Sequence, residues 1–298
     1  MLYRNLSEYF REKYGKRLYK ICIDGGFGCP NRDGTCGVGG CIYCGERGAG
    51  EHIDPTASIR EQVEVGLSGF DDDDYFVAYF QNFTNTYADV HTLRERYDAA
   101  LFDKRVRVLA IGTRPDCIDE ERAALIAEYA KEREVWVELG LQTANDKTAE
   151  VINRGYPREV FARAMEILGK YNIPVVVHLI VGLPGEGLDD VMETVEYING
   201  FNIWGIKIHS IYVMKGTRLE EMYLSGDYIP PSLDEYVESA TYILTHIHPL
   251  TVVHRLTGDC PRGMLTAPDW NSEKHTVINS IVTKMQIENL AQGSLYKN

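Results

Sequence analysis

Six short apolar runs, rich in β-branched and aromatic residues, recur between residues 18 and 213 with helix-like stretches between them. The runs are Leu18–Asp24, Tyr75–Phe80, Arg107–Ile111, Val135–Leu141, Val175–Val181 and Gly205–Val213. The helix-like stretches lie near residues 56–68, 90–103, 119–131, 157–171 and 188–199. Strands that alternate with helices are typical of an α/β fold built on a parallel sheet. The order of these elements therefore predicts that fold class.

The number of strand–helix units sets the expected size of the barrel. A closed barrel of eight such units typically takes about 250 residues, whereas this chain has six units by about residue 225. We therefore expect a partial (β/α)6 TIM-like barrel over residues 18–225 and a C-terminal α/β extension over residues 226–298, packed on its open side. The extension contains helix-like Leu233–His246, strand-like Leu250–Leu256 and helix-like Glu273–Ala291, which could alternatively be the last units of a complete barrel. In either arrangement, ligands should bind at the carboxyl ends of the strands.

The loop after the first strand-like run concentrates cysteine. Cys29, Cys36, Cys41 and Cys44, four of the seven cysteines, lie in one glycine-rich stretch. Glycine lets the backbone turn so that several thiolates can face one centre. The first residues lack the apolar run of a signal peptide, and no segment reaches the roughly 20 apolar residues of a membrane span. We therefore expect a cytoplasmic protein without membrane association, in which reduced thiols form a metal or redox site.

The charge is unevenly distributed along the chain. The net charge of −13 argues against indiscriminate binding to nucleic acid. In contrast, residues 1–17 with the neighbouring Lys20 form a basic N-terminal segment. Its cations are Arg4, Arg11, Lys13, Lys16, Arg17 and Lys20, and aromatic residues lie between them. Such a segment could contact nucleic acid through phosphates and stacked bases. The alternative is an amphipathic helix with a solvated charged face.

Several motifs together resemble a known family. Cys29, Cys41 and Cys44 have the spacing C-x11-C-x2-C, with the aromatic Tyr43 just before the last cysteine. Further motifs follow the later strands in order: Gly112–Asp116, Glu138–Thr143, Asn153–Tyr156, Gly182–Glu186, Lys207–His209 and Lys215–Thr217. This pattern resembles the radical S-adenosylmethionine (SAM) superfamily. The usual spacing there is C-x3-C-x2-C, and the longer loop is similar to the branch that includes the Elongator catalytic subunit. The chain looks like a small uncharacterised family related to that branch.

The resemblance implies an enzyme that cleaves SAM reductively at a [4Fe–4S] cluster to form a 5′-deoxyadenosyl radical. It implies that Cys29, Cys41 and Cys44 ligate the cluster. Residues expected to bind SAM are Tyr43 at the adenine, Gln142 and Arg154 at the ribose and carboxylate, Gly182 and Gly185 beside the nucleoside, and Lys207. An electron donor such as flavodoxin or ferredoxin is also implied.

The resemblance further implies a substrate. The Elongator subunit acts on the wobble uridine of transfer RNA and carries an acetyltransferase domain, for which this chain has no room. We therefore expect radical chemistry on a wobble uridine without acyl transfer, with the basic N-terminal segment contacting the RNA. A radical SAM enzyme for a small metabolite or peptide is the main alternative.

Other interpretations of the residues remain open. Cys36 could complete a four-sulfur zinc site in a noncatalytic RNA-binding module, or replace Cys29 as a ligand. His254, Arg255, Asp259 and Cys260 follow an apolar run and are candidates for lining the substrate site. They could instead form a network that anchors a loop.

Overall fold

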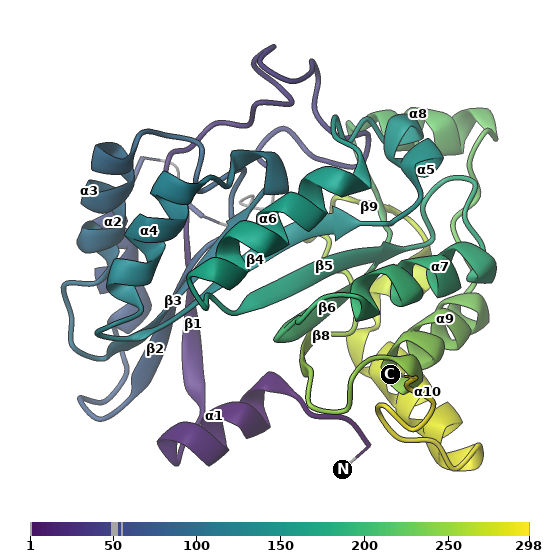
Figure 1. Ribbon diagram of the computed structural model, residues 1–298. Helices are drawn as coiled ribbons and strands as arrows, with labels where there is room; N and C mark the ends of the chain where they lie inside the picture. The colour runs from purple at the N-terminus through teal and green to yellow at the C-terminus, as the bar shows by residue number, and fades with distance from the viewer. Residues whose placement is uncertain (1, 49–52, 55, 298) are drawn as a thin grey trace.

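A seven-stranded parallel sheet, curled into a half-barrel, forms the frame of the molecule (Figure 1). The computed structural model describes residues 2–48, 53–54 and 56–297. In sheet order, the strands are β1 (Leu18–Ile23), β2 (Tyr75–Phe80), β3 (Val106–Thr113), β4 (Glu134–Gln142), β5 (Val175–Val181), β6 (Gly205–Ser210) and β8 (Val252–Arg255). The predicted α/β class with a partial TIM-like barrel is therefore confirmed. The strand-like run expected in the extension supplies β8, which pairs in parallel with β6.

Helices cover the outer face of this sheet. They are α2 (Ile59–Leu67), α3 (Val90–Ala100), α4 (Glu120–Tyr129), α6 (Arg158–Lys170), α7 (Leu188–Asn199), α9 (Leu233–His246) and α10 (Lys274–Ile287). The bounds of α7 and α9 agree with those expected from the sequence. In the extension, α9 packs beside α7, and α10 packs on α9.

Several short elements around the upper rim are not evident from periodicity. They are α5 (Asp146–Val151), α8 (Arg218–Ser225), β7 (Val213–Met214), β9 (Leu265–Ala267) and two 3-10 turns, η1 (Pro115–Cys117) and η2 (Asp269–Ser272). The sixth apolar run, expected as one strand to Val213, ends at Ser210. Val213 instead pairs antiparallel with Ala267 of β9. The apolar character of the run therefore continues past the point where the chain leaves the main sheet.

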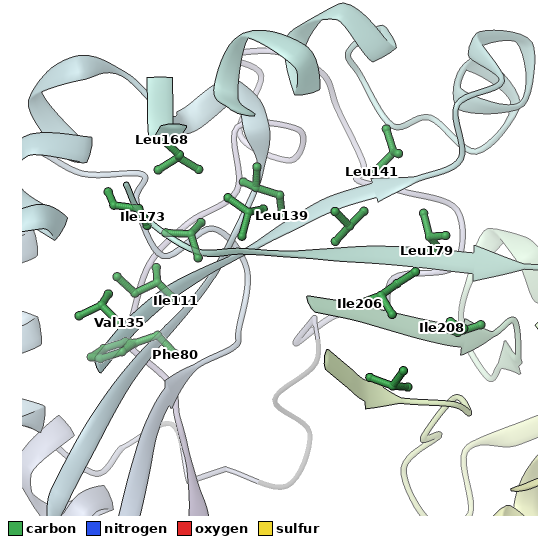
Figure 2. Close-up of a cluster of buried hydrophobic side chains, with 14 of the residues drawn as sticks. Phe80, Ile111, Val135, Leu139, Leu141, Leu168, Ile173, Leu179, Ile206 and Ile208 are labelled. Carbon is green, nitrogen blue, oxygen red and sulfur yellow. The ribbon is translucent and has the colours of Figure 1, made fainter. Parts of the chain in front are cut away.

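The main core lies between the sheet and its covering helices. Alternate residues of each strand point outward, so this layer is made of aliphatic and aromatic side chains. Figure 2 shows Leu139 and Leu141 of β4, Leu179 of β5, and Ile206 and Ile208 of β6 in it. The intervening residues of the same strands face the inside of the half-barrel.

Helix α1 (Leu6–Tyr14) lies across the amino ends of the strands and forms the floor of the half-barrel (Figure 1). Asn5 and Glu8 form a capping box at its start, and Gly15 ends it in a left-handed conformation. Its buried Phe10 packs 6.3 Å from Trp136 between ring centroids. Most of the basic N-terminal segment is thus an amphipathic helix at the end of the barrel opposite the cysteine loop. No helix within the described residues is long and apolar enough to cross a membrane.

Candidate functional site

A cavity of about 270 Å³ opens at the carboxyl ends of the strands, where ligands were expected. It brings together six of the predicted residues, namely Cys29, Cys41, Tyr43, Cys44, Gln142 and Arg154. Its deeper wall is formed by polar side chains from the inner face of the sheet, including Tyr79, Glu138, His178 and His209. The cavity therefore joins the cysteine loop to a polar interior.

The cysteine loop is held by a buried asparagine. Asn31 is fully buried and donates from Nδ2 to the carbonyl of Asn153 at 2.6 Å and to Sγ of Cys41 at 3.8 Å. Gly37 and Gly155 make room for it, since a Cβ at either position would lie 2.3 Å or 2.6 Å from Asn31 Oδ1. The amide of Asn153 donates in turn to the carbonyl of Gly40 at 2.7 Å. The loop is thereby fastened to the segment after α5.

Arg32 fixes the outer part of the same loop. Its guanidinium donates to the carbonyls of Cys44 at 3.3 Å, Gly45 at 2.5 Å and Glu46 at 3.0 Å. Gly40 has φ of 77°, and a Cβ there would lie 2.9 Å from the Arg32 side chain. Neither Asn31 nor Arg32 was singled out from the sequence, although both lie between the first two cysteines of the motif.

Three thiols interact within this loop. Cys41 interacts with Cys44, and Cys44 also lies within electrostatic range of Cys29. The neighbouring Cys44 thiol, opposed by burial and assisted by Arg114, lowers the pKa of Cys41 to about 6. The geometry thus favours a thiolate at Cys41, which is the form that binds metals.

Cys36 lies apart from these three sulfurs. Its side chain is exposed and hydrogen-bonds with Asp116, and Cys117 also approaches that carboxylate with Sγ 3.9 Å from Oδ1. Burial, together with negative Asp116, raises the pKa of Cys36. The structure thus groups Cys36 with Asp116 and Cys117 rather than with the three thiols that line the cavity.

The donor set fits an iron–sulfur cluster with three protein ligands. Three thiols face one cavity, with an asparagine donor and a nearby arginine to stabilise sulfur charge. Within residues 2–48, 53–54 and 56–297, no three His, Cys, Asp or Glu side chains already stand in a metal-ligating arrangement.

Gln142 and Tyr43 lie beside the thiols. Gln142 ends β4 with φ of 63°, next to a register shift between β4 and β5. Such a conformation is rare for a residue other than glycine and is often found at functional sites. The phenol of Tyr43 interacts with Cys41, and burial raises the pKa of Tyr43 well above its usual value. Both side chains are thus held at the mouth of the cavity.

Arg154 is almost wholly buried, with 1% of its side chain exposed. Its guanidinium donates to the carbonyls of Leu141 and Thr143, each at 2.6 Å, and of Tyr156 at 3.0 Å, and pairs with Asp146 at 3.1 Å. These bonds hold the loop after β4, and contact of Arg154 with a ligand stays a prediction.

Arg114 is a second arginine of this wall, and its role was not foreseen from its motif. It forms a bidentate pair with Asp116 at 2.9 and 2.7 Å, and donates to the carbonyl of Arg154 at 3.0 Å. It is the cation that acts on the Cys41 thiol. The signal in the sequence was its position directly after β3, at the carboxyl edge.

A buried ion pair lies beneath the cysteine loop. Glu138 of β4 and Lys207 of β6 pair directly, with 0% and 4% of their side chains exposed. His178 of β5 contacts Glu138 at 2.8 Å, and Tyr79 of β2 contacts the Lys207 amine at 2.9 Å. Burial alone would raise the pKa of Glu138, but Lys207 and His178 hold it well below its usual value. Burial, opposed by Glu138, lowers the pKa of Lys207 to about 7.

The remaining predicted residues do not line the cavity. A Cβ added at Gly182 would lie 2.6 Å from the side chain of Pro231 and 2.8 Å from that of Ile211. Gly185 is exposed in the same turn. Asp259 and Cys260 lie in the loop after β8. Lys207 reaches the cavity only through Glu138, so direct contact of these residues with a ligand stays a prediction.

His254 and Arg255 occupy different levels of the half-barrel. The His254 ring packs at the floor, 5.4 Å from Trp136 and 5.1 Å from Trp204 between centroids. Arg255 is one position further along β8 and contacts Asp259 loosely at 3.8 Å. The four substrate-site candidates are thus not gathered at one point.

Comparison with family models covers most of the chain. A model described as "Radical SAM superfamily" matches residues 26–198, and one described as "Radical_SAM C-terminal domain" matches residues 203–286. The chain is 36% identical over 299 residues to the uncharacterized protein YtqA of Bacillus subtilis, covering 99% of this chain and 93% of that protein. It is 36% identical to protein YhcC of Escherichia coli, covering 89% and 86%.

A more distant likeness is to Elongator proteins. The chain is 28% identical over 184 residues to human Elongator complex protein 3, covering 59% of this chain and 33% of that protein. Among solved structures, the archaeal Methanocaldococcus infernus Elp3 with an N-terminal deletion matches with a TM-score of 0.67 and 18% identity. That match covers 92% of this chain and 64% of the solved one, and it supports the fold.

Proposed function

The chain belongs to the radical SAM superfamily, and we propose that Cys29, Cys41 and Cys44 hold the [4Fe–4S] cluster at which this enzyme cleaves S-adenosylmethionine. The protein is an enzyme whose cofactors are that cluster and SAM. When bound, the cluster supplies one electron that breaks a carbon–sulfur bond of SAM, giving methionine and a 5′-deoxyadenosyl radical that abstracts hydrogen from the substrate.

The observation that carries the ligand assignment is the grouping of the thiols. Cys29, Cys41 and Cys44 line one cavity, whereas Cys36 faces Asp116. Asn31 donates to the Cys41 sulfur, and such donors tune and orient metal ligands. Three cysteine ligands would leave one iron of such a cluster free to bind SAM.

The cavity walls support roles for other residues. We propose that Tyr43 and Gln142 lie against SAM, since both line the cavity beside the thiols. Arg154 lines the same wall, but its donors already bond to carbonyls, so its main contribution is to position the loop that carries Gln142.

The first experiment follows nucleoside formation. The protein would be reconstituted anaerobically with iron and sulfide, mixed with SAM and dithionite, and assayed for 5′-deoxyadenosine and bound iron. The wild type and the matched control Cys36→Ala should form the nucleoside, whereas Cys41→Ala should lose both iron and product. A colourless protein that holds zinc and forms no nucleoside would overturn the function. Loss of iron in Cys36→Ala would overturn the ligand assignment alone.

For the substrate, we propose transfer RNA with a wobble uridine as the reacting nucleoside. The support is the likeness to Elongator complex protein 3 over 184 residues. The basic α1 lies at the floor, opposite the cavity mouth. RNA that contacts both would have to extend along the outside of the barrel, so α1 would bind a part of the RNA distant from the reacting base. A cytoplasmic location and a flavodoxin or ferredoxin as electron donor belong to the same proposal.

A further inference from the structure

The inner face of the half-barrel carries more charge than its ion pair explains. On β6, Ile206 and Ile208 face the apolar layer, so Lys207 and His209 alternate toward the interior. His209 lines the cavity with Tyr79, Glu138 and His178, below the cysteine loop. These groups come from different strands and are held by a rigid sheet, which favours a defined binding geometry.

The charges of this interior do not cancel. Lys207 is neutralised by Glu138, but Lys20 and Arg255 also act electrostatically on Lys207. The Lys20 amine lies 4.6 Å and the Lys207 amine 4.3 Å from the centroid of the Tyr79 ring. The charges of Lys20, Lys207 and Arg255 all act to lower the pKa of Cys22, against the larger opposing effect of burial. The three cations therefore lie in one neighbourhood.

Acidic groups nearby do not remove this excess. The Asp259 carboxylate pairs more closely with Lys274, at 2.5 Å, than with Arg255, at 3.8 Å. Counting Lys20, Lys207, Arg255 and Lys274 against Glu138 and Asp259, this neighbourhood has two more positive than negative charges. Lys207 and Glu138 are buried, whereas the other four side chains reach solvent. An excess of one sign of charge attracts an ion of opposite sign.

One polar atom beside these charges also lacks a partner. Nε2 of His209 is buried, and no hydrogen-bond partner for it is found in the described part of the chain. Burial and Arg255 hold the pKa of His209 well below its usual value, so the ring is neutral. A neutral imidazole with its hydrogen on Nε2 can donate to an oxygen, which would recover the cost of about 1–3 kcal/mol for an unpaired buried group.

We propose that Lys20, Lys207, Arg255 and His209 form a subsite that binds an anionic oxygen group of the substrate, a carboxylate or a phosphate. This inference rests on the proposed radical SAM function, and it places the reacting molecule at the inner end of the cavity. Only His209 of the four lines the cavity itself; Lys20 and Lys207 lie against the ring of Tyr79, which also lines it. Cations and an N–H group that converge on one oxygen anion form charge-assisted hydrogen bonds, which are stronger than neutral ones. A neutral substrate would form no charge-assisted hydrogen bond with these cations.

The test uses acetate and acetamide, which have similar shape and differ in charge. Saturation-transfer NMR on the reconstituted enzyme should detect acetate binding several-fold tighter than acetamide, with inorganic phosphate as competitor. Lys20→Gln with Arg255→Gln should weaken acetate binding by about fivefold or more. Lys20 is exposed, 38% of the Arg255 side chain is exposed, and neither residue is the direct partner of Glu138, so the fold should tolerate these changes. Lys170→Gln, which removes a surface cation on α6 paired with Glu120, is the matched control and should bind as wild type.

Each outcome bears on one claim. Displacement of acetate by phosphate supports a phosphate group, and failure to displace it supports a carboxylate. Equal binding of acetate and acetamide, or unchanged binding in the Lys20→Gln/Arg255→Gln double variant, overturns the subsite. Displacement of acetate by SAM, with weaker SAM binding in that variant, also overturns it, because the cations would then serve the SAM carboxylate. The 5′-deoxyadenosine assay is run on the same samples, so nucleoside formation without anion preference rejects the subsite and leaves the radical SAM function intact.

Discussion

Replacing Lys207 by methionine isolates the energetic role of the buried ion pair. The change keeps the length of the side chain but leaves the carboxylate of Glu138, with 0% of its side chain exposed, without its main cation. Tyr79 also loses its contact with the amine at 2.9 Å. Removing one partner of a buried pair typically costs about 3–5 kcal/mol. We expect a loss of this size in the free energy of unfolding.

A double variant tests whether this cost comes from uncompensated charge. Glu138→Gln keeps an oxygen that can accept from the Trp136 indole, now at 3.1 Å, but carries no charge. Combined with Lys207→Met, it should recover about 2 kcal/mol relative to the sum of the single changes, within the range for directly coupled residues. The assay is urea unfolding at pH 6, below the pKa of about 7 for Lys207.

The control for this cycle is a surface pair. Lys170 and Glu120 are each about half exposed at 2.9 Å, so Lys170→Met should leave the urea midpoint close to that of the wild type. A loss below about 1 kcal/mol for Lys207→Met, or strictly additive effects in the double variant, would refute the reasoning that Glu138 depends on Lys207.

Three further changes test other parts of the structure. Asn31→Leu removes the donor to Cys41 and Asn153, so iron bound after reconstitution should fall by about half or more; iron equal to wild type would contradict its role in the loop. Burial holds the pKa of His254 well below the value near 6.5 that it has in the unfolded chain. The unfolded chain therefore takes up more protons than the folded one as the pH drops below about 6.5. The free energy of unfolding should then fall by up to about 1.4 kcal/mol per pH unit. His254→Phe should flatten that fall in urea unfolding between pH 7 and 5, and an unchanged slope would contradict it. Reversing the charges of Arg11, Lys13 and Lys16 should weaken transfer RNA binding and its salt dependence in filter binding. Unchanged binding would exclude the basic N-terminal segment as a contact.

Much of the fold could be predicted from local patterns. The runs Tyr75–Phe80 and Val175–Val181 have the bounds of β2 and β5, because buried parallel strands are continuously apolar and end at polar loops. The extra elements around the rim could not be predicted, since β7 and β9 have two and three residues and exist only because they pair with each other. A pairing between residues some fifty positions apart has no local signature.

The candidate site likewise contains residues that the sequence predicted and residues that it did not. Cys29, Cys41, Cys44 and Tyr43 lie close together in the sequence, so their spacing alone places them in one loop. Asn31 was missed because its importance depends on contacts with residues after α5, more than 100 positions away. Lys207 was expected to bind a cofactor, but its main partner in the structure is Glu138, 69 positions earlier.

By itself, the sequence determined the alternation of strands and helices, the cysteine loop at a strand end and the acidic overall charge. These properties are local or additive, so periodicity, spacing and composition carry them. Only the tertiary structure decided that Cys36 turns to Asp116, that α1 lies at the floor, and that cations from β1, β6 and β8 share one interior. Those facts depend on which residues a curled parallel sheet brings together, because its inward-facing side chains come from strands that are distant in sequence and adjacent only after folding.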